Sequence, residues 1–205
     1  MSISRKTAVG GLMLALAVIL PRVVHLVGAA DLGRILLPMH IPVLLSGFIV
    51  GPVFGLAIGA LSPVLSYLLS GMPAPDRLVF MVFELAGYGF MSGLLYQSFK
   101  LCKTRYGTAV SLVGAMVFGR LVYALALFAA ADLLNISKIK PAAVIDAVTA
   151  GIIGIVIQII LIPAVIYLLK KSRVIDSFVF QDKSGGVTED LAAGEKGRAD
   201  EQNHD

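Results

Sequence analysis

The segment from Ile35 to Pro75, ILLPMHIPVLLSGFIVGPVFGLAIGALSPVLSYLLSGMPAP, contains no Asp, Glu, Lys or Arg, and His40 is its one residue that titrates near neutral pH. A bilayer core needs only about 20 apolar residues per helix, so this segment is long enough for two spans. Gly51-Pro52 supplies the break between them. The segment therefore predicts a membrane protein whose chain crosses the bilayer repeatedly.

The composition of the whole chain agrees with this prediction. Hydrophobic residues make up 58% of the sequence and charged residues 15%, whereas soluble domains carry about 25% charged residues. At 205 residues the chain has room for one membrane domain. We therefore predict an all-α integral membrane protein in the cell membrane, with its membrane domain over residues 1–171.

The spacing of charged and turn residues predicts six transmembrane helices. The first resembles a secretory signal peptide, but Arg22 and His25 interrupt the approach to the small-residue patch after it, so we expect this span to be retained. An even number of spans places both ends of the domain on one side of the membrane. The expected ranges are 7–27, 36–50, 53–70, 78–99, 106–131 and 142–169.

The basic residues indicate the orientation of these spans. On the side opposite the termini, bases are mixed with Asp31, Asp76, Asp132 and Asp146. By the positive-inside rule the N- and C-termini are cytoplasmic. Residues 172–205 hold eight acids and four bases with few apolar side chains, which is typical of a disordered polar tail. The cytoplasmic side of the membrane domain carries bases without acids, namely Arg5, Lys6, Lys100, Lys103, Arg105, Lys170 and Lys171.

Strongly polar residues lie deep inside four of the predicted spans. Such groups are costly in lipid and usually face a bundle interior or a water-filled cavity. At 1.5 Å per residue, His40, Glu84 and Arg120 lie about 6, 9 and 16 Å from the outer ends of their spans. Gln158 lies nearer the midplane and would form the floor of a pocket open to the outside.

We interpret these residues as the lining of a site for a small polar or anionic molecule. Tyr88 and Tyr123 extend the faces of Glu84 and Arg120 by one helical turn. Arg120 is the strongest candidate, because its planar fork suits a carboxylate or phosphate. The predicted substrate-binding residues are His40, Ser62, Glu84, Tyr88, Arg120, Tyr123 and Gln158.

Structural roles remain open for several of these residues. Glu84 and Arg120 would neutralise each other if they paired. His40 follows Pro38 and precedes Pro42, two residues without a backbone N–H, so its imidazole could satisfy a freed carbonyl group. Gln158 could form a hydrogen bond between helices, and Ser62 could bond to its own helix backbone.

The sequence gives little support to enzymatic activity. It contains no H-E-x-x-H, no G-x-S-x-G and no Walker A sequence, and no predicted span carries two carboxylates. We therefore expect no cofactor, no metal site and no nucleic-acid partner, and we expect the energy for any uphill transport to come from another protein.

Several stretches resemble the substrate-binding S components of energy-coupling factor (ECF) transporters, most closely the branch that includes the pantothenate-type S components. The likeness covers about residues 5–171. The stretches that carry it are LPMHIPVLL (residues 37–45), Gly51-Pro52, GALSP (59–63), SGMP (70–73) and FELAGYG (83–89).

This resemblance implies a six-helix protein that captures a vitamin or related micronutrient from outside. It would dock on a transmembrane coupling protein and two cytosolic ATPases. Ala8, Gly11 and Ala15 would face the coupling protein, although Leu12 departs from the family's row of small residues. Pantothenate-like cargo is favoured, while related members serve pyridoxine-like, hydroxymethylpyrimidine-like or queuosine-precursor ligands.

Two other functions remain open on the sequence. A secondary transporter working without ATPases would move protons through His40 and Glu84. A membrane enzyme acting on a lipid-like substrate is disfavoured, because no catalytic constellation is present. A secondary transporter would carry out uptake without other proteins, and this uptake would stop when the proton gradient is dissipated. An ECF importer would need its ATPases.

Overall fold

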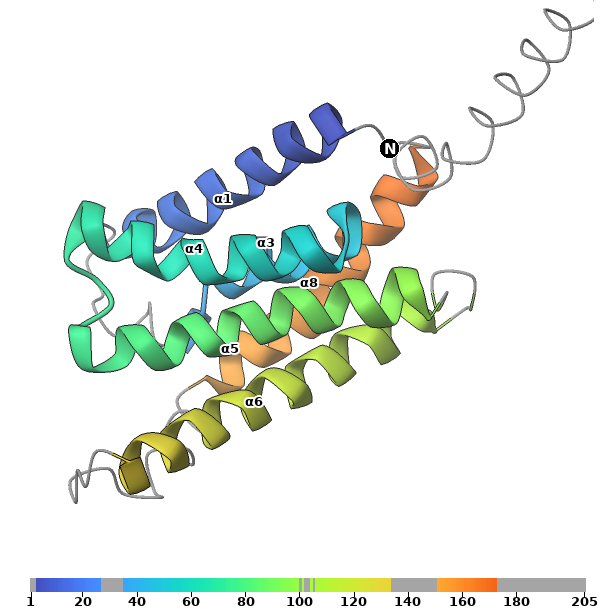
Figure 1. Ribbon diagram of the computed structural model, residues 1–205. Helices are drawn as coiled ribbons and strands as arrows, with labels where there is room; N and C mark the ends of the chain where they lie inside the picture. Colours follow the sequence, from blue (N-terminus) through green and yellow to red (C-terminus); the bar gives the residue numbers. More distant parts are fainter. Residues whose placement is uncertain are drawn as a thin grey trace, which may run out of the picture.

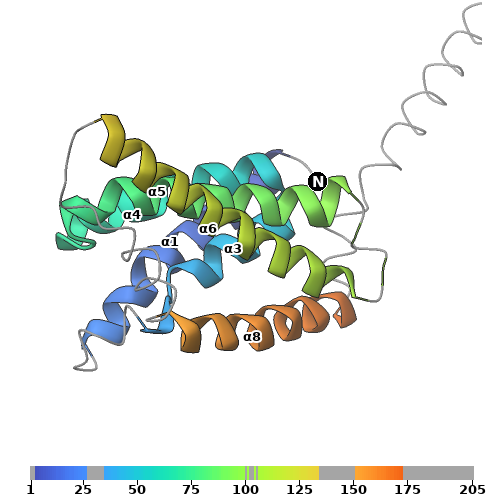
Figure 2. The ribbon, with the colours of Figure 1, turned by 90° about the horizontal axis from the view of Figure 1, so that it is seen from below.

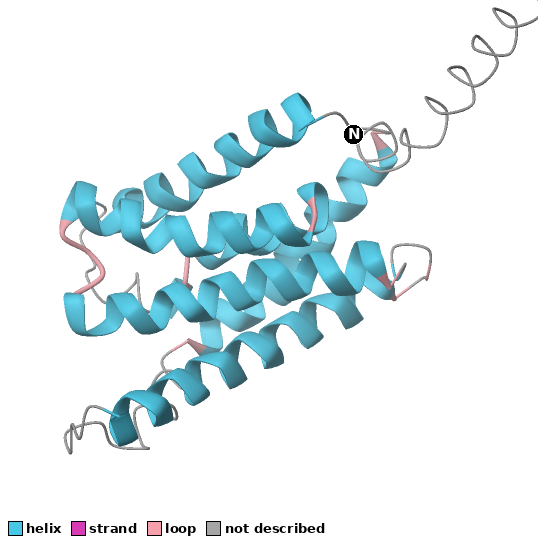
Figure 3. Cartoon of the chain, viewed as in Figure 1, coloured by secondary structure: helices cyan, strands magenta, loops and turns pink. Residues whose placement is uncertain are grey.

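The computed structural model consists of helices and contains no strand within residues 3–26, 35–99, 101, 104, 106–133 and 151–172, which are the ones it describes (Figure 3). This confirms the all-α class. Residues 142–150 of the last predicted span, and the predicted tail from residue 173 on, lie outside this set. The elements are α1 (Ile3–Leu26), α3 (His40–Val50), α4 (Pro52–Ser70), α5 (Pro75–Gly93), the π-helical segment η1 (Leu94–Ser98), α6 (Gly107–Leu133) and α8 (Ile152–Lys171).

Five segments of the described chain are long and apolar enough to cross a membrane, which makes this a multi-pass membrane protein. α3 has 11 residues, about 16 Å of helix, and is shorter than the roughly 30 Å hydrocarbon core. The sixth span and the cytoplasmic location of both termini therefore stay predictions. The five segments are Ile3–Val24, Pro52–Ser70, Pro75–Ser98, Gly107–Ala130 and Ile152–Lys171.

The second predicted helix, 36–50, starts too early, because the chain is not helical from residue 37 to residue 39. Leu37 adopts a positive φ of 49°, and Pro38 has no N–H to donate. The His40 N–H donates to the Leu37 carbonyl oxygen at 3.0 Å, and α3 begins there. α3 ends at Gly51, whose φ of 114° suits glycine, and Pro52 opens α4 as the sequence predicted.

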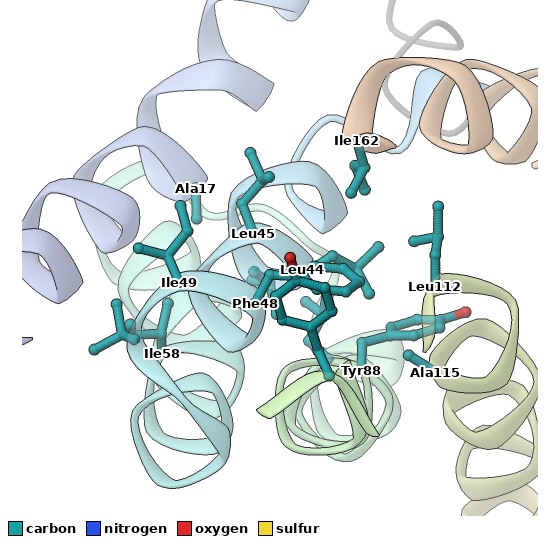
Figure 4. Close-up of a cluster of buried hydrophobic side chains, with 14 of the residues drawn as sticks. Ala17, Leu44, Leu45, Phe48, Ile49, Ile58, Tyr88, Leu112, Ala115 and Ile162 are labelled. Atoms are coloured by element: carbon teal, nitrogen blue, oxygen red, sulfur yellow. The ribbon is translucent and has the colours of Figure 1, made fainter. Parts of the chain in front are cut away.

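α3 lies in the middle of the bundle. Ten of its 11 residues are buried, as expected for a helix that is apolar on all sides. It contacts α1, α4, α5 and α8, while α6 packs against α5 and α8 (Figure 1 and Figure 2). Figure 4 shows the buried cluster that joins these helices, with side chains such as Ala17, Leu44, Ile58, Tyr88, Leu112 and Ile162.

Glycines bring α3, α4 and α5 into backbone contact. A methyl group added to Gly55 would overlap the Gly89 carbonyl, and one added to Gly89 would overlap the Gly55 carbonyl. Gly59 meets the Leu85 carbonyl in the same way, and Gly47 meets Gly89. Small residues allow this close approach between helices in lipid. These glycines therefore hold α3, α4 and α5 together.

Two side chains of the α5–η1 segment also hold α3 in place. The Ser92 hydroxyl lies 3.2 Å from the Leu44 carbonyl oxygen. The Gln97 amide Nε2 donates to the carbonyl oxygens of Phe48 and Ile49 at 3.0 and 3.2 Å. Carbonyls in the last turn of a helix lack partners within that helix, so Gln97 satisfies groups that would otherwise be buried without one.

Gly89→Ala should lower the stability of the protein in detergent by at least about 2 kcal/mol, because the added methyl overlaps a backbone carbonyl that has little freedom to move. The measurement is thermal unfolding at a fixed scan rate. Gly11→Ala is the matched control, since a Cβ at Gly11 meets nothing within 4 Å among the described residues. Equal unfolding midpoints for the two variants would contradict the packing described.

Candidate functional site

The Glu84 carboxylate is the centre of a buried polar cluster. Glu84 lies on α5 and is 4% exposed. Its Oε1 atom accepts a hydrogen bond from Arg120 Nη1 at 2.9 Å and another from the Tyr88 hydroxyl at 3.2 Å. The cluster therefore joins two turns of α5 to the middle of α6.

The contact between α5 and α6 places Arg120 beside Glu84. Gly119 leaves room for the Tyr88 ring, because a Cβ at Gly119 would lie 2.6 Å from Cδ1 of that ring. One residue further on, the Arg120 side chain turns to the carboxylate and is 17% exposed. The structure thus pairs Glu84 with Arg120, which was one of the two possibilities left open by the sequence.

His40 approaches the same carboxylate from α3. Its Nε2 lies 3.9 Å from Glu84 Oε1, which is too long for a hydrogen bond. Its ring packs edge-on against the Tyr88 ring, with 5.2 Å between centroids. His40 is 3% exposed, so the start of α3 closes one side of the cluster.

The cluster contains more hydrogen-bonding groups than the described chain satisfies. Nε and Nη2 of Arg120, and both ring nitrogens of His40, are buried without a hydrogen-bond partner in that part of the structure. Buried polar atoms are partnered in the great majority of cases, and an unpartnered one costs about 1–3 kcal/mol. Four such atoms around one carboxylate indicate that a further group completes the cluster.

The other predicted site residues each have surroundings of their own. Gln158 on α8 is 1% exposed, and its Nε2 has no partner among the described residues. Tyr123 follows Arg120 by one turn and packs edge-on against Phe80, with 6.3 Å between ring centroids. Ser62 donates to the Ile58 carbonyl oxygen at 2.5 Å, which is the bond to its own helix backbone that the sequence left open.

α1 presents the predicted docking row on its outer face. Ala8, Gly11 and Ala15 are all exposed, and so is Leu12. The opposite face carries Ala17, which packs into the buried cluster of Figure 4. Ala8, Gly11 and Ala15 therefore lie away from the face that packs α1 against the rest of the described chain.

Sequence reasoning gave no site role to three other residues with unsatisfied groups. Arg22 near the outer end of α1 has buried Nε and Nη2 atoms without a partner in the described ranges. An arginine inside a predicted span was a visible signal, but we used it only as evidence that the first span is retained. Tyr96 and Ser111 are fully buried at the other end of the bundle, and their hydroxyls also lack partners within the described residues.

One known protein family is similar to this chain. The family model described as ECF transporter, substrate-specific component, matches residues 5–166. The matched range begins within α1 and ends within α8, so it includes every predicted site residue. No curated protein and no solved structure matches the chain.

Glu84 and Arg120 should be strongly coupled in stability measurements. Glu84→Leu or Arg120→Met alone should cost about 3–5 kcal/mol, because each leaves an uncompensated buried charge. The double variant should cost less than the sum of the two by at least about 2 kcal/mol. Unfolding of the ligand-free protein in detergent measures all three variants, and additive costs would show that the pair is not coupled.

Proposed function

The chain belongs to the family of ECF transporter substrate-specific components, and from this premise we propose that it captures a vitamin or related micronutrient in a pocket open to the outside of the cell. Membership in this family makes the chain the substrate-binding component of an importer and not an enzyme. Its partners are an ECF module and a small-molecule substrate.

The observation that carries the proposed pocket is the set of unsatisfied nitrogens around Glu84. Arg120 and His40 come from different helices, and their free nitrogens surround one carboxylate. A substrate with several hydrogen-bond acceptors would bond to these nitrogens. The free-energy penalty of burying them without a partner would then be absent while the substrate is bound. Gln158 adds one more free donor from α8.

Pantothenate-like cargo is our first choice of substrate. It combines an anionic carboxylate with hydroxyl and amide oxygens, which suits a pocket containing an arginine, an imidazole and an amide. Pyridoxine-like, hydroxymethylpyrimidine-like and queuosine-precursor ligands are the alternatives within the same branch of the family.

Energy for import is proposed to come from one transmembrane coupling protein and two cytosolic ATPases. The proposed docking surface on this chain is the exposed row of Ala8, Gly11 and Ala15 on α1, with the exposed Leu12 beside it. Small residues let a second helix approach the α1 backbone closely within the membrane.

Arg120→Ala should reduce ligand affinity more than 100-fold, because it removes the one cationic side chain of the pocket. The measurement is equilibrium binding to purified protein, with insertion and monodispersity checked by size-exclusion chromatography. Arg77→Ala is the matched control, since Arg77 is exposed at the start of α5. Binding within about threefold of wild type would make Arg120 a structural residue.

Gly11→Leu and Ala15→Leu should each reduce co-purification with the coupling protein and the ATPases at least about 10-fold, while ligand binding is kept. The added side chain fits the isolated chain, since Gly11 has open space within the described structure, but it would block a closely packed partner helix. Val117→Leu on the exposed face of α6 is the control. Unchanged co-purification would move the docking surface away from α1.

The rival function, a proton-coupled secondary transporter, takes its support from the 3.9 Å approach of His40 Nε2 to Glu84. Reconstituted liposomes separate the two proposals. Uptake by this chain alone that stops when the proton gradient is dissipated favours the rival, whereas uptake that requires the ATPases and ATP favours the ECF importer.

A further inference from the structure

We infer that the substrate carries a carboxylate and that this group binds side-on to the Nε–Nη2 edge of Arg120, with Glu84 acting as the positioning residue for that edge. The inference rests on the proposed function and narrows its substrate class. It is drawn from two sets of atoms in the cluster, those that already have a hydrogen-bond partner and those that have none in the described structure.

The free atoms of Arg120 form one edge of the guanidinium group. Nη1 bonds to Glu84, whereas Nε and Nη2 are buried and have no partner in the described structure. The N–H bonds of Nε and Nη2 along this edge are parallel and spaced to meet the two oxygens of one carboxylate. A single carbonyl or hydroxyl oxygen would have to be shared between the two N–H groups, at a poorer angle to each.

Glu84 fixes the direction of this edge without covering it. Its Oε1 also accepts from the Tyr88 hydroxyl and lies near His40, so its charge is shared among several groups. Because the guanidinium group is planar, holding Nη1 against Oε1 also sets where the Nε–Nη2 edge points. Gly119 and the Tyr88 ring hold the backbone of α6 at the distance this geometry needs.

The remaining free atoms are mostly donors. Gln158 contributes an amide Nε2, and His40 contributes one N–H and one acceptor nitrogen in its neutral form. Carboxylate oxygens do not occur among the unsatisfied side-chain atoms of the described chain. The unsatisfied buried atoms of the described residues therefore favour a substrate that brings hydrogen-bond acceptors, and a second acceptor such as a hydroxyl or amide oxygen would suit Gln158.

Charge balance is compatible with a second carboxylate. The Glu84–Arg120 pair is neutral, so a bound monoanion adds one negative charge to the buried cluster. The positive charge of Arg120 is spread over the whole guanidinium group, so its free edge still attracts an anion.

The test is native mass spectrometry and equilibrium binding of the purified full chain with matched probe pairs. The pairs are pantothenate with panthenol, nicotinate with nicotinamide, and biotin with its alcohol, and pyridoxine and thiamine serve as neutral and cationic probes. We expect at least one of the three carboxylate probes to bind at least about 30-fold more tightly than the neutral probe of the same pair. Any molecule that co-purifies with the chain is identified by its mass and should carry a carboxylate.

Variants separate the roles of the residues. In Arg120→Gln the preference for the carboxylate over its neutral partner should fall to within about threefold, while Arg77→Gln keeps the preference. Glu84→Gln retains an acceptor for Nη1 and should keep the preference, whereas Glu84→Leu should lose it. Gln158→Leu should lower the affinity for both probes of a pair by a similar factor.

Two results would overturn the inference. Tightest binding of a neutral or cationic molecule, or equal binding of both members of a pair, would contradict a carboxylate site while leaving the S-component function intact. If the folded chain binds none of the probes, also binds no pyridoxine-like, hydroxymethylpyrimidine-like or queuosine-precursor ligand and carries no co-purified molecule, the proposed vitamin capture itself is wrong, and the inference fails with it.

Discussion

A buried carboxylate must be paired, and the pairing of Glu84 with Arg120 is the constraint on which the arrangement of the polar cluster depends. Taking either charge into a membrane bundle alone costs several kcal/mol, so the two helices that carry them must meet at this level. Tyr88 and His40 add a hydrogen bond and a close approach to the same oxygen atom. The pairing uses Nη1 of Arg120 and neutralises both charges. Nε and Nη2 of the same side chain stay without a partner in the described structure and can bind another group.

The glycine contacts make this pairing possible. Gly55 and Gly59 of α4 lie against the backbone of α5, and Gly119 of α6 accommodates the Tyr88 ring. α5 is thus fixed on two sides, and the Glu84 side chain is directed to Arg120. α3 is held to the same helix by Ser92 and Gln97, which sets the position of His40. A rigid inner frame of this kind presents a few polar groups with little freedom to reorganise.

Much of this could be read from the sequence, because charges are rare enough in a membrane domain to mark both the ends of spans and the sites within them. The positions of α4, α5 and α6 agree with the predicted ranges within a few residues. The start of α3 was wrong, since it depends on the backbone conformation of Leu37, which has no sequence signal. The π-helical segment η1 was not predicted either, and there Gln97 bonds to carbonyls almost fifty residues away. The sequence predicted that Glu84 and Arg120 line one site, but only the structure shows which nitrogens remain free.

The central claim is that polar side chains from α3, α5, α6 and α8 surround one substrate near the outer surface. An experimental structure of the full chain purified with its bound cargo tests this most directly. The account predicts density for a small molecule among His40, Arg120 and Gln158, with two of its oxygens about 3 Å from Nε and Nη2 of Arg120. Density elsewhere, or these side chains sealed against one another with no space between them, would contradict it.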